Sequence, residues 1–204
     1  MCIRDRQELT KFDYSICLAA SLAYLMISQQ DPVGLITFND RIRQSLPPKS
    51  KRTQLGNLLS LLSNLEPDGT TDFKHSIGQM ISMFKNKSLV MIFSDFLVDE
   101  AETLDALYRL KHAGHDVILF HVLDEAEVNF PFKGVFKMRD PETDEELKID
   151  AEGHRKGYLA QIAAFRDDLA KNCSRVGIDY VPIDTSMQFD KALIEYLHSR
   201  RARG

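Results

Sequence analysis

Cysteine is scarce in this chain, and its three cysteines, Cys2, Cys17 and Cys173, are odd in number and far apart. This spacing fits neither a disulfide framework nor a zinc site, because both need cysteines in pairs or close clusters. We therefore expect reduced thiols and a cytosolic compartment, with Cys17 and Cys173 serving as small core residues. No run of about eighteen apolar residues occurs either, so no membrane segment is predicted in this sequence.

The chain also lacks the short motifs that mark many α/β enzymes. It contains no Gly-x-Gly-x-x-Gly, no Gly-x-x-x-x-Gly-Lys-Ser/Thr, no Gly-x-Ser-x-Gly, no His-Glu-x-x-His and no Cys-x-x-Cys. Nucleotide binding and acyl transfer thereby lose their strongest sequence signals. Asp95 is followed by Phe96 and Leu97, which disfavours a phosphatase of the Asp-x-Asp type. We expect a protein that is not an enzyme.

An excess of positive charge is missing as well. Lysine and arginine number 26 against 30 aspartates and glutamates, which gives a formal net charge of -4. A surface that is acidic on average repels polyanions, so we expect no nucleic-acid partner. With 204 residues, the chain is long enough for one domain with a full hydrophobic core.

What is present is the alternation of helices and strands that is typical of an α/β protein with a parallel sheet. Apolar periodicity predicts helices over residues 11–30, 53–65, 72–85, 101–113, 151–176 and 190–200. Apolar runs predict strands over residues 33–38, 89–93, 116–123 and 178–183, and an antiparallel strand over residues 41–46 that ends at Pro47-Pro48. We expect a mostly parallel sheet with one antiparallel edge strand and with helices on both faces.

This alternation breaks between residues 127 and 150. Apolar residues there alternate with polar ones on both sides of the polar segment 140–144, namely Phe136, Met138, Leu147 and Ile149. The pattern predicts a β-hairpin inserted into the α/β frame. The hairpin is either a binding appendage or an ornament at the edge of the sheet that covers Phe130 and Phe132.

Two polar stretches stand where predicted strands and helices meet. Thr71 precedes the helix over residues 72–85, and Asp95 follows the strand over residues 89–93. Open parallel sheets bind ligands at the carboxyl ends of their strands, and a hydroxyl and a carboxylate are oxygen ligands that Mg²⁺ accepts. We predict that Thr71 and Asp95 belong to one metal site. The alternative is structural, with Thr71 as a helix N-cap and Asp95 as the cap of a turn.

The histidines form no recognisable catalytic set. His112 and His115 flank the turn at Gly114, and we expect both at the surface. His121 lies within an apolar strand, so we expect a hydrogen-bonded core histidine.

Several segments carry a family resemblance by their order along the chain. They are Lys11-Phe12-Asp13-Tyr14, residues 18–25, residues 31–38, Pro47-Pro48, Thr71-Asp72, Ser94-Asp95 and residues 114–118. Together they resemble the bacterial domain-of-unknown-function 58 family, whose C-terminal part is a von Willebrand factor A-like domain. The likeness runs from about Gln7 to the last predicted helix.

The resemblance implies a Rossmann-like, von Willebrand A-type sheet whose central first strand ends in Asp-x-Ser-x-Ser. That motif is the main arm of a metal-ion-dependent adhesion site, to which Thr71 and Asp95 would add a hydroxyl and a second aspartate. Neither the motif nor its strand is found here, where both would precede Lys11. We therefore expect residues 11–204 to be an incomplete domain with its hairpin at 127–150.

Two further expectations follow from the missing strand. Residues 1–10 are expected to be a non-native or disordered leader. A slot is expected between the strands 33–38 and 89–93, and the burial lost with a central strand, about 10 kcal/mol, would leave the isolated chain only marginally stable.

A complete adhesion site leaves one coordination position for a carboxylate from a protein partner. The resemblance therefore implies a metal-ion-dependent protein-binding module. Its parent would be membrane-anchored and would work with a MoxR-type AAA+ ATPase in the assembly or maturation of other proteins. Mg²⁺ or another divalent cation would bind the complete protein, but weakly or not at all this chain, because Thr71 and Asp95 alone offer too few oxygens.

Two alternatives to this binding module stay open. The first is a Mg²⁺-dependent hydrolase that uses Asp95, for which Asp99 and Glu100 are the only carboxylates nearby in the sequence. These two are also expected as acidic residues in the first turn of a helix. The second alternative is a scaffold in which Thr71 and Asp95 only cap local structure.

Overall fold

A computed structural model of the chain describes residues 9–67, 70–139, 146–188 and 191. Its helices are α1 (Lys11–Ser28), α2 (Arg52–Ser63), α3 (Phe73–Met83), α4 (Glu100–His112), α5 (Glu125–Asn129) and α6 (Ala151–Arg175). Its strands are β1 (Val33–Phe38), β2 (Ile42–Lys49), β3 (Leu89–Ser94), β4 (Asp116–Leu123), β5 (Val135–Arg139), β6 (Glu146–Asp150) and β7 (Asp179–Asp184). Residues 1–8 of the expected leader, and the expected helix over residues 190–200 apart from residue 191, lie outside the described residues. Thr10, which was assigned to the leader, is instead the N-cap of α1.

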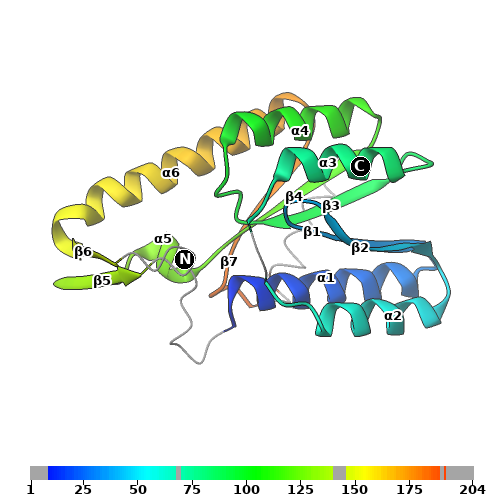
Figure 1. Cartoon of the computed structure of the whole chain (residues 1–204), viewed down its shortest axis with the longest axis horizontal. Coiled ribbons are helices and arrows are strands. Elements are labelled where there is room, and N and C mark those ends of the chain that lie inside the picture. The colour runs from blue at the N-terminus through cyan, green and yellow to red at the C-terminus, as the bar shows by residue number, and fades with distance from the viewer. Residues whose placement is uncertain (1–8, 68–69, 140–145, 189–190, 192–204) are drawn as a thin grey trace.

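A parallel sheet of three strands, in the order β3-β4-β7, forms the centre of the molecule. Its middle strand β4 is buried along nearly its whole length, because helices cover both of its faces. Val117 and Leu119 face the helices α3, α4 and α6, whereas Ile118, Phe120 and Val122 face α1. Figure 1 shows these two helical layers on opposite sides of the strands. The predicted α/β class and the helices on both faces are confirmed.

An antiparallel pair, β1 and β2, forms a sheet of its own. The strands come so close at Gly34 that an added Cβ would lie 2.7 Å from the carbonyl oxygen of Leu46. The side chain of Gln54, on α2, donates to the carbonyl oxygens of Val33 and Pro47, at 2.9 Å each, and ties the pair to that helix. The predicted hairpin is confirmed.

The second strand of this pair does not end at Pro47-Pro48, as the sequence suggested. It continues to Lys49, which pairs with Val33. Proline has no N–H to give to a ladder, but a strand that pairs along one side only tolerates it. The prediction that the strand ends at these prolines was therefore wrong, because an edge strand can continue through them.

No backbone ladder joins β1 to β3 among the described residues. Ile36 and Phe38 on β1 nevertheless pack against the core that covers β3 and β4. The strands thus form a parallel part and an antiparallel part that share side-chain packing, and no ladder closes the slot that was expected between the strands 33–38 and 89–93.

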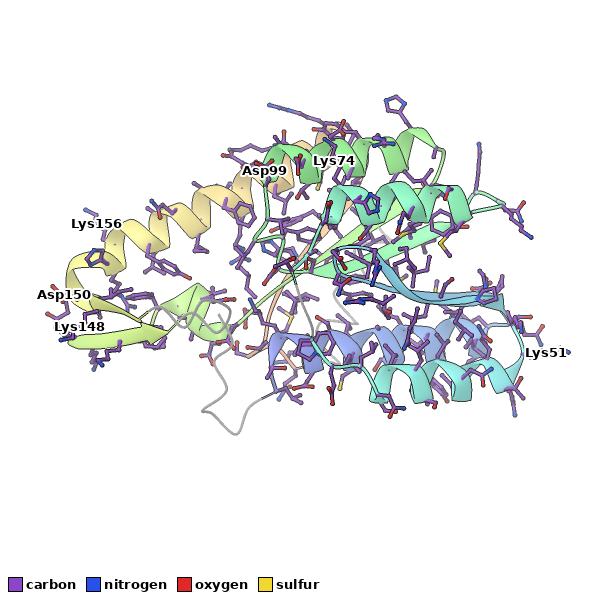
Figure 2. All side chains as sticks on the ribbon, viewed as in Figure 1. Lys51, Lys74, Asp99, Lys148, Asp150 and Lys156 are labelled. Atoms are coloured by element: carbon purple, nitrogen blue, oxygen red, sulfur yellow. The ribbon has the colours of Figure 1, made fainter. Side chains whose placement is uncertain are left out.

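The predicted inserted hairpin is confirmed as β5 and β6, which pair antiparallel and lead into α6 at Asp150. Figure 2 shows Asp150 at this end of the molecule, with Lys148 and Lys156 close by. The insertion begins later than expected, because residues 125–129 form α5. Phe130 packs against Phe132 and against Tyr158 of α6, so α6 helps to cover Phe130.

Candidate functional site

Asp95 lies in a tight loop directly after β3. Ser94 accepts a hydrogen bond from the Phe96 backbone N–H at 3.0 Å, and Asp95 Oδ1 accepts one from the Leu97 N–H at 3.3 Å. Phe96 adopts a left-handed backbone with a φ of 51°, although its side chain is fully buried. A non-glycine residue in this conformation is held there by its surroundings. Asp95 caps this turn, as the structural alternative held, and one carboxylate oxygen is left for other contacts.

That second oxygen is bound by Lys11, the first residue of α1. Lys11 Nζ lies 2.8 Å from Asp95 Oδ2 and 2.9 Å from Glu127 Oε1. We call these three residues the Lys11 cluster. Thr10 holds the lysine in place by capping α1, since its hydroxyl accepts a hydrogen bond from the Asp13 N–H at 3.1 Å.

Glu127 is the most buried member of the Lys11 cluster, with 5% of its side chain exposed. Its other oxygen, Oε2, accepts a hydrogen bond from the Asp124 backbone N–H at 2.8 Å, as the second half of a capping box on α5. Both carboxylate oxygens therefore have partners, as a buried charge requires.

The Lys11 cluster stabilises its own charges. Burial alone would lower the pKa of Lys11, but the carboxylates of Asp95 and Glu127 outweigh it and raise that pKa. Burial alone would raise the pKa of Asp95, but the ammonium of Lys11 outweighs it and lowers that pKa. Lys11 and Asp95 are thus both ionised at neutral pH.

Thr71 is exposed and lies just before α3. The N-cap of this helix is Asp72, whose carboxylate accepts a hydrogen bond from the His75 N–H at 2.8 Å, so the proposed capping role of Thr71 is wrong. Phe73 packs edge to face on Phe96, with ring centroids 5.7 Å apart. The start of α3 and the Asp95 loop are therefore neighbours, whereas the ligation of a metal by Thr71 and Asp95 stays a prediction.

As they stand, the described residues do not fit a divalent cation. They contain no group of three or more histidine, cysteine, aspartate or glutamate side chains that could hold one. The positive charge beside Asp95 is instead the ammonium of Lys11. Mg²⁺ needs about six oxygen ligands in near-octahedral geometry, so further oxygens and a displaced Lys11 would both be required.

The sequence reasoning missed Lys11 and Glu127 as site residues. They are separated from their partners by 84 and 116 positions in the chain. No spacing rule connects such positions. The one available signal was a glutamate three residues after Asp124, which marks a capping box and not an ion pair.

His121 lies on β4, opposite Ser94 in the strand register. Its Nδ1 is 2.7 Å from the hydroxyl of Tyr180, and the rings of Phe96 and Phe165 stand edge to face against it. Burial, followed by the charge of Arg166, lowers the pKa of His121 to about 4. The predicted hydrogen-bonded core histidine is confirmed, and it is neutral at physiological pH.

His115 is not the surface histidine that its turn suggested. Only 4% of the residue is exposed, its ring packs on Phe84, and its Nδ1 accepts a hydrogen bond from the Ser88 N–H at 3.2 Å. The turn itself is exposed, and Gly114 has a φ of 89° as a helix C-terminal turn requires. His112 is exposed, as expected.

A second group of charged side chains lines a groove between α3 and α4, which we call the α3/α4 groove. Its lining includes Asp72, Lys74, His75, Glu102 and Arg109. Lys74 and Glu102 form an ion pair at 3.6 Å, with about half of each side chain exposed. Figure 2 shows Lys74 on α3 close to the start of α4, where Asp99 lies.

These features define a class of protein: an α/β domain with a parallel sheet, helices on both faces and charged residues near the carboxyl end of β3. The chain belongs to the family described as protein of unknown function DUF58, which matches residues 5–168. This confirms the family that the sequence resembles.

The chain is also similar to curated proteins. The uncharacterized protein Rv1480 of Mycobacterium tuberculosis is 23% identical over 198 residues. That match covers 94% of this chain but 61% of the relative, so the chain spans about three fifths of the length of such relatives.

Two solved structures share the fold. The conserved hypothetical protein BatB from Bacteroides thetaiotaomicron has a TM-score of 0.57 at 16% identity, over 96% of this chain and 90% of that one. An aerotolerance-related membrane protein from Bacteroides fragilis has a TM-score of 0.60 at 16% identity, over 96% and 92%. Within the described residues of the present chain, no helix is both long and apolar enough to span a bilayer.

Proposed function

We propose that this chain is part of a von Willebrand A-like module that binds a protein partner through a divalent cation. The observation that carries the proposal is the meeting of two loops, seen in the contact of Phe73 with Phe96. This contact brings the start of α3, which Thr71 precedes, next to the loop that holds Asp95. Thr71 and Asp95 would supply two of the oxygen ligands, and a carboxylate of the partner would complete the coordination.

The strand topology supports the von Willebrand A-like part of this proposal. β1 pairs only with β2, and β3 pairs only with β4, so one edge of each strand has no ladder partner among the described residues. The side chains of β1 and β3 nevertheless share one core. We propose that a further parallel strand, from a part of the protein outside the described residues, lies between them. Its carboxyl end would meet the Asp95 loop and bring the additional oxygens that the cation needs.

Partner capture by the full-length protein tests this function. A purified MoxR-type ATPase serves as the probe, with and without Mg²⁺. We expect Asp95→Asn and Thr71→Ala to weaken the Mg²⁺-dependent part of the binding at least about tenfold. The matched control is Asp105→Asn, because Asp105 is an exposed aspartate on α4. Binding that depends on neither Mg²⁺ nor Asp95 would contradict the proposal.

A Mg²⁺-dependent hydrolase is the second candidate, and one observation favours it. In the structure, the ammonium group of Lys11 pairs with both Asp95 and Glu127. Glu127 is therefore a second carboxylate near Asp95, which could not be recognised from the sequence. Asp99 is not this second carboxylate, because it is the N-cap of α4 and accepts a hydrogen bond from the Glu102 N–H at 2.8 Å. Mg²⁺-dependent turnover of p-nitrophenyl phosphate that disappears in Asp95→Asn would favour the hydrolase.

We also propose that the whole protein is attached to a membrane through a part outside the described residues. One solved structure of this fold is described as a membrane protein, and the curated relative from Mycobacterium tuberculosis is longer than this chain. Fractionation of cells that express the full-length protein tests this proposal.

A further inference from the structure

We propose that His121 is a positioning residue, which holds the Asp95 loop, residues 95–99, in the conformation that presents the Asp95 carboxylate. The loop connects β3 to α4, and His121 reaches it from the neighbouring strand β4. This inference rests on the proposed function, because Asp95 is the binding residue that the loop presents. The conformation of the loop can nevertheless be measured without a partner.

The first argument is the backbone conformation of Phe96. Its φ of 51° lies in the left-handed region, which bulky residues rarely adopt, and only 1% of the residue is exposed. Such a conformation persists only where the surroundings impose it. Because Phe96 directly follows Asp95 in the chain, the contacts that fix Phe96 also fix the direction of the Asp95 side chain.

The second argument is the packing around Phe96. The rings of Phe73 and His121 both stand edge to face against it, with centroids 5.7 Å away in each case. Phe73 is the first residue of α3, whereas His121 lies on a buried strand that is paired on both sides, with β3 and with β7. Core strands open far less often than helix ends do. His121 is therefore the fixed wall of this pocket.

The third argument is that the imidazole ring is itself held in place. Its Nδ1 lies 2.7 Å from the hydroxyl of Tyr180, and the ring of Phe165 stands edge to face against it at 5.5 Å. Burial raises the pKa of Tyr180 to about 12, whereas the charge of Arg166 and a side-chain hydrogen bond with it act in the opposite direction. Arginine can only donate, so the tyrosine hydroxyl is left to donate its own proton to Nδ1. His121 is then the tautomer with its proton on Nε2.

The fourth argument concerns this second nitrogen. Nε2 is buried and makes no hydrogen bond of normal geometry among the described residues. Burial and the charge of Arg166 lower the pKa of His121, whereas the charge and the backbone of Asp95 act in the opposite direction. The Asp95 backbone is therefore within reach of the ring, and a buried N–H favours a carbonyl oxygen beside it. The imidazole thus acts on the loop both at Phe96 and at Asp95.

Amide hydrogen exchange of the purified chain tests this role. The readout is the Leu97 N–H, which donates to Asp95 Oδ1, and the control is the Glu152 N–H, which is capped in the same way at the start of α6. His121→Gln removes the ring, so we expect the Leu97 N–H to exchange at least about fivefold faster, the factor that corresponds to roughly one lost hydrogen bond. The Glu152 N–H should not change. His121→Phe keeps an aromatic edge against Phe96 and should restore slow exchange at Leu97.

Two results of this experiment would overturn the proposal. One is unchanged exchange at Leu97 in His121→Gln. The other is equal acceleration at Leu97 and Glu152, which would mean that His121 contributes to stability alone. If His121→Gln does not fold, Tyr180→Phe takes its place, because it removes the hydroxyl that fixes the ring and hardly changes the shape of the side chain. The same two outcomes then decide.

A second measurement uses the unmodified chain. Nitrogen-15 NMR of the imidazole groups at neutral pH should show the proton of His121 on Nε2, with Nδ1 unprotonated. His112, which is exposed, gives the reference signal of a solvated histidine. A proton on Nδ1 of His121 would overturn the proposal, because Nε2 could then donate nothing to the Asp95 backbone.

The two proposals fail in different ways. Unchanged exchange at Leu97 in His121→Gln would overturn the positioning role and leave partner capture through Asp95 standing. Partner capture by the full-length protein that is indifferent to Asp95→Asn would count against the function, whereas the effect of His121 on the loop would still be measurable.

Discussion

The Lys11 cluster and the α3/α4 groove contain the same kinds of side chain but differ in burial and in reach. Lys11 has 18% of its side chain exposed and pairs with residues that are 84 and 116 positions away from it in the chain. Lys74 has 44% of its side chain exposed, and its ion pair joins two consecutive helices. Water screens the second pair, and holding two long side chains together offsets most of what is gained. Inside the first cluster, the removal of Lys11 leaves the carboxylate of Glu127, with 5% of its side chain exposed, without the ammonium that pairs with it. Burial, and not the kind of charge, makes one of these groups a candidate site.

The largest effect that can break this comparison is expected for Lys11→Met. We expect the free energy of unfolding to fall by about 3 kcal/mol, because Glu127 is left buried and unpaired. Urea denaturation at neutral pH measures the change. Lys74→Met is the matched control, and a loss at Lys11 no larger than the loss at Lys74 would contradict the distinction.

An effect of similar size concerns pH. His121 is buried as a neutral ring that faces Tyr180, Arg166 and Asp95, and its pKa is lowered from 6.5 to about 4. The unfolded chain therefore takes up this proton at a higher pH than the folded chain does. Stability should be complete above pH 6.5 and fall by about 3 kcal/mol as the pH decreases towards 4.

Urea denaturation at a series of pH values checks this slope. His121→Gln should flatten it, whereas His112→Gln, at an exposed position, should keep it. A slope that survives in His121→Gln would show that other groups cause it. The result sharpens the comparison, because it tests whether a buried group near the Lys11 cluster tolerates further positive charge.

A moderate effect is expected at the edge of the α3/α4 groove. Asp72→Ala should lower the free energy of unfolding by about 1 kcal/mol, because the His75 N–H loses its capping partner. Thr71→Ala should change stability very little, since Thr71 is exposed and is not the cap. Thermal unfolding of both variants gives the answer, and a larger loss at Thr71 would mean that its hydroxyl has a structural role.

The smallest effect is expected for the exposed pair itself. A double-mutant cycle with Lys74→Met and Glu102→Gln should yield a coupling of less than about 0.5 kcal/mol at physiological salt. A coupling above about 1 kcal/mol would remove the contrast between the two groups of charges.

The strands show how much of the fold can be predicted from local patterns. The run of β4 is apolar at nearly every position, which indicates a strand covered on both faces, and β3 and β7 follow the same logic. The division of the sheet between β1 and β3 has no such local signal, because pairing depends on which strands are available as neighbours.

The histidines and prolines show where local patterns mislead. His115 follows a glycine turn, yet Phe84 from the end of α3 packs on its ring and Ser88 donates to it. Pro47 and Pro48 read as the end of a strand, yet they lie on an edge where their missing N–H groups do no harm. In both cases the deciding neighbour comes from another element.

The sequence by itself determined the α/β class, the positions of most of the described helices and strands but not α5, the inserted hairpin and the placement of Asp95 at a strand end. These follow from periodicity and capping, which act over a few residues. Only the tertiary structure decided that Lys11 and Glu127 meet at Asp95. An ion pair across more than eighty residues arises from the packing of α1 and α5 around the end of β3, and no property of the separate segments specifies it.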